Sequence, residues 1–183
     1  MRVITGIAKG KRLVTAEGLD VRPTPEKVKE GLFSSIQFDI EGRKVLDLFG
    51  GSGQLGIEAL SRGAESAVFV DLNPVSVKNI TKNLETTGFT ENSKVIRGDF
   101  AAVLMGLDEK FDLVFLDPPY ASDFWAKALK LLDKKLSTSG RVFCEHPDQK
   151  ELEEQVGKLV KVKTYRYGKV CVSVYERKSD GDE

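Results

Sequence analysis

The sequence predicts an α/β fold whose mainly parallel, doubly wound sheet ends in an antiparallel hairpin. Three observations lead to this prediction. Short β-branched runs alternate with helical stretches from residue 44 to residue 145, which is typical of parallel sheets covered by helices. A glycine-rich turn follows the first of these runs. Two extended runs then come near the end, with no helix between them.

The central elements are expected to follow one another in βαβ order. Strands are predicted at 44–48, 67–70, 94–96, 111–116 and 141–145, and helices at 55–62, 74–87, 100–107 and 124–132. The run 111–116 is apolar after Asp112, as expected for a strand covered on both faces. Pro74 suits a first helical turn, where its missing N–H would have no partner.

Both ends of the chain depart from this alternation. Residues 159–166 and 169–176 are expected to pair as the antiparallel hairpin. Residues 2–7 and 12–14 predict a small N-terminal hairpin, and a helix should follow with Thr24 as its N-cap and Pro25 as its first residue. A parallel sheet closed by a hairpin is the layout of Rossmann-like class I methyltransferases, whereas dehydrogenases typically add another parallel strand.

Length and composition favour one soluble domain. The 183 residues are 40% hydrophobic and 31% charged, with no apolar run long enough to span a membrane. The two cysteines, Cys144 and Cys171, form no paired motif, so neither a disulfide framework nor a zinc site is expected. We expect a cytoplasmic monomer with a basic extension at 1–40, a catalytic core at 41–177 and a disordered tail at 178–183.

Charge is unevenly distributed although the formal net charge is zero. Residues 1–16 contain bases and no acid, and the same holds for residues 155–175. Such asymmetry can produce a positive face on a neutral protein, but solvated lysines on exposed strands would give the same pattern. Charge alone therefore decides nothing about nucleic acid.

The segment DLFGGSGQLG, residues 47–56, is the strongest local signal for a ligand site. Its glycines, Gly51 and Gly53 among them, let the backbone approach a ligand closely. A pyrophosphate would disfavour the carboxylate of Asp47 beside it, whereas the ammonium and sulfonium groups of S-adenosylmethionine would benefit from it. The sequence therefore favours S-adenosylmethionine as cofactor.

Two further acids follow the next two strands. Asp71 lies 20 residues after Gly51, at the position expected for binding ribose hydroxyls, and Asp99 could bond the adenine amino group. Either acid alone would more often be a helix cap or turn residue. Three acids at consecutive strand ends beside a glycine turn favour a cofactor site, because ligands collect at the carboxyl ends of strands in such sheets.

The motif DPPY, residues 117–120, ends the fourth strand at the same edge. The Asp117 carboxylate and the Pro118 carbonyl could hold both protons of an amino group, while Pro119 helps to fix the backbone. Tyr120 offers a face on which a planar base can stack, worth roughly 1–3 kcal/mol. We expect transfer of a methyl group from sulfur to the exocyclic nitrogen of a base, without a metal.

At this point the sequence resembles the bacterial small-subunit ribosomal RNA guanine-N2 methyltransferases, type D, over about residues 1–176. The resemblance rests on MRVITG with GKRL, on RPT at 22–24, on DLFGGSG, on EALSRG at 58–63 and on DPPY. The glycine turn and DPPY are typical of amino-methyltransferases in general, and the N-terminal segment with RPT narrows the match. Gly50 departs from the alanine usual in the family.

The resemblance implies methylation of N2 of one guanine in 16S rRNA, on the RNA or on an assembling small subunit. It implies cofactor contacts from Asp47, Phe49, Gly51, Ser52, Gly53, Asp71, Leu72, Asp99 and Phe100. It places the N-terminal region, including Arg22 and Thr24, beside the active site and the RNA. Phosphate contacts from Arg2, Lys9, Lys11 and Arg12 agree with the charge distribution.

Three alternatives remain open. The chain could methylate adenine N6 or a protein glutamine, although such motifs commonly carry Asn in place of Asp. It could be a ribosome-assembly factor that binds cofactor and RNA without turnover, which the intact DPPY motif disfavours. A nicotinamide dehydrogenase is disfavoured by Asp47 and by the terminal hairpin.

Overall fold

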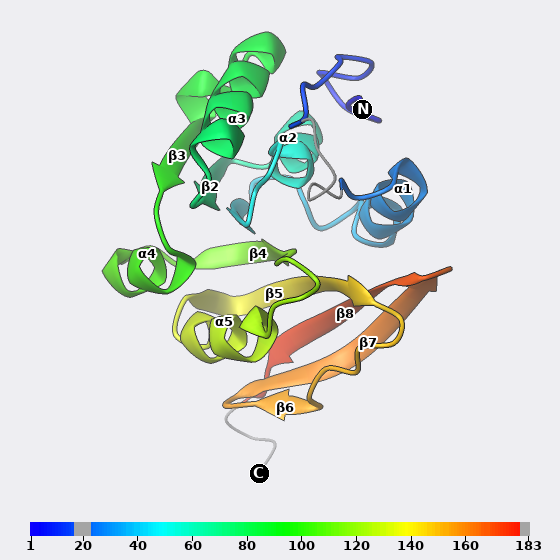
Figure 1. Cartoon of the computed structure of the whole chain (residues 1–183), viewed down its shortest axis with the longest axis vertical. Helices are drawn as coiled ribbons and strands as arrows, with labels where there is room; N and C mark the ends of the chain where they lie inside the picture. Colours follow the sequence, from blue (N-terminus) through cyan, green and yellow to red (C-terminus); the bar gives the residue numbers. More distant parts are fainter. Residues whose placement is uncertain (17–22, 180–183) are drawn as a thin grey trace.

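One continuous sheet with helices on both faces forms the core of the protein (Figure 1). The computed structural model describes residues 1–16 and 23–179. The strands are β1 (Lys44–Leu48), β2 (Ser66–Asp71), β3 (Ser93–Arg97), β4 (Phe111–Leu116), β5 (Leu136–Pro147), β6 (Gln155–Val156), β7 (Leu159–Tyr167) and β8 (Val170–Arg177). The helices are α1 (Glu26–Ser35), α2 (Gln54–Ser61), α3 (Pro74–Thr87), α4 (Phe100–Gly106) and α5 (Phe124–Leu132), with a 3-10 turn at Thr90–Asn92.

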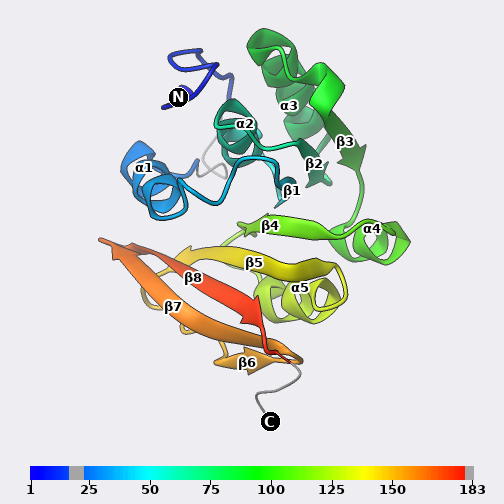
Figure 2. The same ribbon diagram turned by 180° about the vertical axis from the view of Figure 1, so that it is seen from behind.

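The strand order across the sheet is β3-β2-β1-β4-β5-β8-β7-β6, and β1 to β5 pair in parallel, as predicted. Successive strand residues point to opposite faces. Val45 and Phe69 therefore pack with α1, α2 and α3, whereas Leu46 and Val68 pack with α4 and α5. Figure 2 shows the same two layers from behind, with α1 and α5 on opposite sides of β4 and β5. No helix in the described part of the chain has the length and apolar character needed to cross a bilayer.

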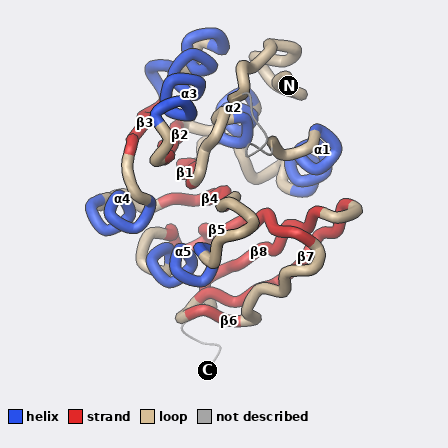
Figure 3. The backbone as a smooth tube through the Cα atoms, in the orientation of Figure 1, coloured by secondary structure: helices blue, strands red, loops and turns tan. Residues whose placement is uncertain are grey.

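The antiparallel end of the sheet confirms the predicted hairpin and extends it (Figure 3). β7 and β8 turn at Gly168, whose φ is +66°, and β8 inserts between β5 and β7. β5 begins at Leu136 and not at residue 141 as expected. A register shift against β4 divides it. Gly140 lies beside this shift, where an added Cβ would come within 2.8 Å of the Phe111 carbonyl. The two-residue strand β6 was not predicted.

The first 14 residues form a closed loop, which is the predicted N-terminal hairpin in a reduced form. Arg2 and Arg12 make an isolated antiparallel bridge, and Val3 N–H donates to the Lys11 carbonyl at 2.9 Å. The loop then leads through residues 17–22, which lie outside the described residues, toward α1.

The predicted cap of α1 is wrong. Pro25 occupies the N-cap position without a side-chain bond, and its carbonyl accepts from Lys29 N–H at 3.0 Å. The Thr24 hydroxyl instead donates to the buried carboxylate of Glu145 on β5, at 2.5 Å. The hydrogen bond that the Thr24 hydroxyl donates to a charged carboxylate is stronger than the one it would accept from a backbone N–H as a helix cap.

Candidate active site at the carboxyl edge of the sheet

The parallel strands end at one edge, and residues of the predicted site follow those ends. At this edge the register pairs Leu48 of β1 with Val70 of β2 and with Leu116 of β4, and Leu116 with Cys144 of β5. The next residues along the chain, Phe49, Asp71, Asp117 and Glu145, therefore follow these paired positions at one edge. Neighbouring strands lie about 4.8 Å apart. Asp117 therefore stands between the glycine turn and Glu145, so that the predicted cofactor and base positions adjoin.

The glycine turn is held in place by backbone bonds to β2. Gly50 N–H donates to the Val70 carbonyl at 3.1 Å, and Gly51 N–H donates to Asp71 Oδ2 at 2.9 Å. Gly51 and Gly53 have φ of +60° and +80°, which a side chain would disfavour. Phe49 adopts φ of +61°, the only positive φ of a non-glycine residue in the described chain. Such strain is typical of functional sites.

Asp47 lies under the glycine turn and is only 3% exposed. Its Oδ2 accepts from the N–H of Gly56, the third residue of α2, at 3.0 Å. Burial raises the pKa of Asp47 to about 8, a bond from Gly56 opposes the rise, and the charge of Asp71 adds to it. A cation bound nearby would favour the ionised form, so the site suits a positively charged ligand.

The raised pKa of Asp47 predicts a dependence of stability on pH. Between about pH 4 and pH 8 the folded protein holds a proton on Asp47 that the unfolded chain releases, so this residue makes stability fall as pH rises. The slope is at most about 1.4 kcal/mol per pH unit. Asp47→Asn should abolish this component. Urea denaturation of both proteins between pH 5 and pH 8 measures the difference, and parallel curves for the two would contradict the assignment.

The other two predicted acids also organise backbone. Asp71 Oδ1 accepts from Asn73 N–H at 2.9 Å, so both of its oxygens are aligned at the tip of β2. Asp99 caps α4 by accepting from Ala101 and Ala102 N–H at 3.1 and 3.2 Å. Leu72, beside Asp71, is 66% exposed, which is unusual for a leucine and leaves an apolar surface next to the acid.

Three phenylalanines gather at the same edge. Phe49 lies 5.1 Å from Phe100 and stacks on Phe124 at 5.8 Å with the rings 5° apart. Phe100 and Phe124 are 5.2 Å apart, and Phe124 is 38% exposed. Sequence analysis did not identify Phe124 as part of this site. The available signal was its position at the start of α5, only four residues after DPPY.

The DPPY motif forms a tight turn after β4. Ser122 closes it, since its N–H and Oγ donate to the Pro119 carbonyl at 2.9 and 2.6 Å. Pro118 is buried, while Asp117 and Tyr120 are half-buried. The Tyr120 ring packs against the buried side chain of Trp125, with the ring centroids 6.4 Å apart. The motif thus presents a carboxylate and an aromatic ring on a rigid turn.

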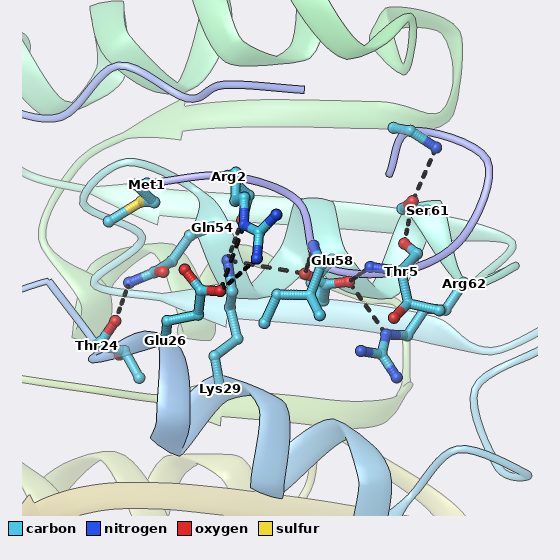
Figure 4. Close-up of polar contacts among 12 residues, drawn as sticks. Met1, Arg2, Thr5, Thr24, Glu26, Lys29, Gln54, Glu58, Ser61 and Arg62 are labelled. Carbon is cyan, nitrogen blue, oxygen red and sulfur yellow. Dashed lines mark hydrogen bonds and ion pairs between the residues drawn. The ribbon is translucent and has the colours of Figure 1, made fainter. Parts of the chain in front are cut away.

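Figure 4 shows how the N-terminal loop is fixed to the core. The completely buried carboxylate of Glu58 on α2 accepts from Ile4 and Thr5 N–H at 2.8 and 3.0 Å. Arg62 donates to it at 3.1 Å, and the buried ammonium of Lys29 lies 3.7 Å away. Desolvation lowers the pKa of Lys29, and the nearby Glu58 opposes this. Sequence reasoning missed Glu58, although an acid in the apolar helix QLGIEALS is an anomaly.

The predicted RNA contacts are not equivalent in the structure. The side chains of Lys9, Lys11 and Arg12 are exposed on the N-terminal loop. Arg2 pairs with Glu26 at 3.0 Å, and Thr24 is buried against Glu145. Arg22 lies outside the described residues. The loop therefore presents three exposed bases, while Arg2 and Thr24 already have protein partners.

Residues 1–176 match the sequence model of a family described as conserved hypothetical protein 95. YlbH of Bacillus subtilis, provisionally named an rRNA methyltransferase, is 39% identical over 183 residues, 97% of this chain and 100% of that protein. The ribosomal RNA small subunit methyltransferase D of Haemophilus influenzae is 36% identical over 135 residues, covering 72% of this chain and 70% of that protein. The chain belongs to this methyltransferase D family.

The fold of this methyltransferase is also that of solved relatives. The structure of yhhF from Escherichia coli, provisionally named a methyltransferase, superposes with a TM-score of 0.84 at 26% identity, over 98% of this chain and 99% of that one. The methyl donor is S-adenosylmethionine, as the sequence predicted. The structure brings the predicted cofactor residues Asp47, Phe49, Gly51, Ser52, Gly53, Asp71, Leu72, Asp99 and Phe100 to consecutive strand ends of one sheet edge.

Proposed function

We propose that this methyltransferase methylates the N2 amino group of a guanine in small-subunit rRNA. The observation that carries the proposal is the position of Asp117 directly after β4, whose last residue, Leu116, pairs with Leu48 just before the glycine turn. The names of the relatives support ribosomal RNA as substrate. On this proposal the protein acts in the cytoplasm, as a monomer, on the RNA or on an assembling small subunit.

The residues at the sheet edge fit S-adenosylmethionine. Ribose hydroxyls would bind Asp71, whose carboxylate is aligned by Gly51 and Asn73. The exposed side chain of Leu72 and the ring of Phe100 would cover the adenine. The ammonium group would lie at the glycine turn above Asp47. When bound, this cofactor supplies an electrophilic methyl group on sulfur.

An aspartate in this motif suits guanine better than adenine. The Watson–Crick edge of guanine offers two neighbouring donors, N1–H and N2–H, which the two oxygens of a carboxylate can accept together. Adenine offers one donor and one acceptor on that edge, which match an asparagine amide. Asp117 therefore selects for guanine by the pattern of its hydrogen-bond groups.

The chain positions the amine and needs no general base of its own. Asp117 and the Pro118 carbonyl accept the amino protons, which turns the nitrogen lone pair toward the methyl group. The Tyr120 ring supports the base from one face. The proton lost after transfer leaves to solvent from the motif, where Pro119 is exposed.

The proposal is tested with labelled S-adenosylmethionine and small ribosomal subunits from a strain that lacks this activity. The labelled nucleoside, identified by mass, should be N2-methylguanosine. Label in N6-methyladenosine or in protein would overturn the proposed substrate. Cofactor binding with no label in any product would favour an assembly factor without turnover.

We further propose that Lys9, Lys11 and Arg12 contact RNA phosphates. Replacing all three by alanine should weaken RNA binding and reduce the slope of log K against log salt by roughly 2 to 3. Filter binding at several salt concentrations measures the slope. The matched control replaces Lys78, Lys82 and Lys94, which are exposed on α3 and β3. Equal slopes for the two triple variants would contradict the placement of RNA on the N-terminal loop.

A further inference from the structure

Glu145 is a buried acid whose role the proposed reaction does not explain. It lies near the end of β5, directly after Cys144, which pairs with Leu116 of β4 just before Asp117. Burying a carboxylate costs several kcal/mol, and an apolar residue is often as stable or more stable at such a site. A structural role in the core therefore accounts poorly for an acid at this position.

The two oxygens of Glu145 hold partners from opposite sides of the sheet. Oε2 accepts from the hydroxyl of Thr24, which precedes α1, at 2.5 Å. Oε1 accepts from the hydroxyl of Tyr120 at the longer distance of 3.4 Å. Tyr120 packs with the α5 layer, whereas α1 belongs to the other layer. The carboxylate thus spans the sheet edge, where the two layers meet.

The same contacts continue to the glycine turn. Gln54, the first residue of α2 after the turn, donates from Nε2 to the Thr24 carbonyl at 3.3 Å. The Glu145 carbonyl accepts from Trp125 Nε1 at 3.0 Å, beneath the Tyr120 ring. A continuous set of bonds therefore runs from Gln54 through Thr24 and Glu145 to Tyr120, which joins the cofactor turn to the base-stacking residue.

We propose that Glu145 is a positioning residue that fixes the Tyr120 ring and the segment before α1 relative to the cofactor turn. The inference rests on the proposed function, since it assigns Tyr120 to the target base. Glu145 does not touch the reacting atoms. It holds the plane of the ring, and with it the angle at which the amino nitrogen faces the methyl group. Small errors in that angle cost rate and leave cofactor affinity unchanged.

The test compares Glu145→Ala, Glu145→Gln, Thr24→Val and Tyr120→Phe in the full-length protein with small subunits as substrate. Glu145→Ala should lower kcat about 10- to 100-fold with KM for S-adenosylmethionine within about twofold. Glu145→Gln should recover most of the rate, because its amide can accept one hydroxyl and donate to the other. Glu109→Ala, an exposed acid before β4, is the matched control.

A double-mutant cycle separates positioning from stability. Tyr120→Phe removes the hydroxyl that bonds Glu145. The double variant Tyr120→Phe/Glu145→Ala should be no slower than Glu145→Ala alone, because both substitutions break the same bond between Tyr120 and Glu145. If the two single reductions in kcat multiply in the double variant, the inference is overturned. The inference is also overturned if Glu145→Ala melts at a lower temperature but keeps the wild-type kcat. Equal reductions in kcat for Glu145→Gln and Glu145→Ala would overturn it as well. If the wild type itself makes no N2-methylguanosine, the proposed function fails instead.

Discussion

Replacing Asp117 by alanine is expected to lower the rate of methyl transfer about 10²- to 10³-fold, the range found when one preorganised polar group is removed from an active site. The variant loses both acceptor oxygens and can no longer aim the amino group. Affinity for S-adenosylmethionine should stay within about twofold, because the bonds that hold the glycine turn to Asp71 and Val70 remain in the variant. Single-turnover kinetics and calorimetric cofactor binding measure the two quantities.

Asp117→Asn tests whether the hydrogen-bond acceptors of Asp117, and not only the size of its side chain, are needed for the reaction. The amide has nearly the same size, but in either orientation it turns a donor toward a donor of guanine, so a loss of at least about 10-fold is expected. Asp108→Asn, an exposed change in the loop before β4, should leave the rate unchanged. An Asp117→Asn enzyme as fast as the wild type would contradict the carboxylate pairing with guanine.

Glu58→Ala is expected to have the largest effect on stability, a loss of about 3–5 kcal/mol. The change leaves the ammonium of Lys29, which is 1% exposed, without its buried counter-charge. It also removes the acceptor of Ile4 and Thr5 N–H. Urea denaturation at neutral pH measures the loss of unfolding free energy.

The same change should release the N-terminal loop before the core unfolds. Limited proteolysis by trypsin should therefore cut near Lys9 and Lys11 faster in Glu58→Ala than in the wild type. Glu85→Ala, an exposed acid on α3, should change stability by no more than about 0.5 kcal/mol. A loss below about 1 kcal/mol for Glu58→Ala would show that the buried cluster contributes little.

The sequence was sufficient for the central fold because its signals are local. The apolar strands, the helical spacing and the terminal hairpin are each recognisable from residues that are contiguous in the sequence. The four predicted helices of the core accordingly begin and end within about one residue of the observed ones. The start of β5 was misplaced because residues 137–140, STSG, carry no apolar alternation. β6 escaped because a two-residue strand exists only through its pairing with β7.

In the candidate site, too, the residues in contiguous motifs were predictable and those that depend on contacts between distant residues were not. The glycine turn and DPPY were recognisable because each is one segment, and the structure places both at one edge. Phe124, Glu58 and Glu145 gain their importance from contacts with residues that are distant along the chain. The ring of His146 lies 2.8 Å from the Ser173 hydroxyl and 2.9 Å from the Pro147 carbonyl, so its bonds are structural. Thr24 was misassigned because a local cap was the only partner that sequence could suggest.

The place of β8 inside the sheet bears on how this protein is made. β8 is the last of the described strands in chain order, yet it pairs with β5 along seven residues, from Arg141 to Pro147. During synthesis β5, which carries Glu145, remains an open edge until β8 has emerged. An open apolar edge can pair with other chains. Nascent chains halted before β8 should thus depend on chaperones, and the active-site edge is completed only after β8 has emerged.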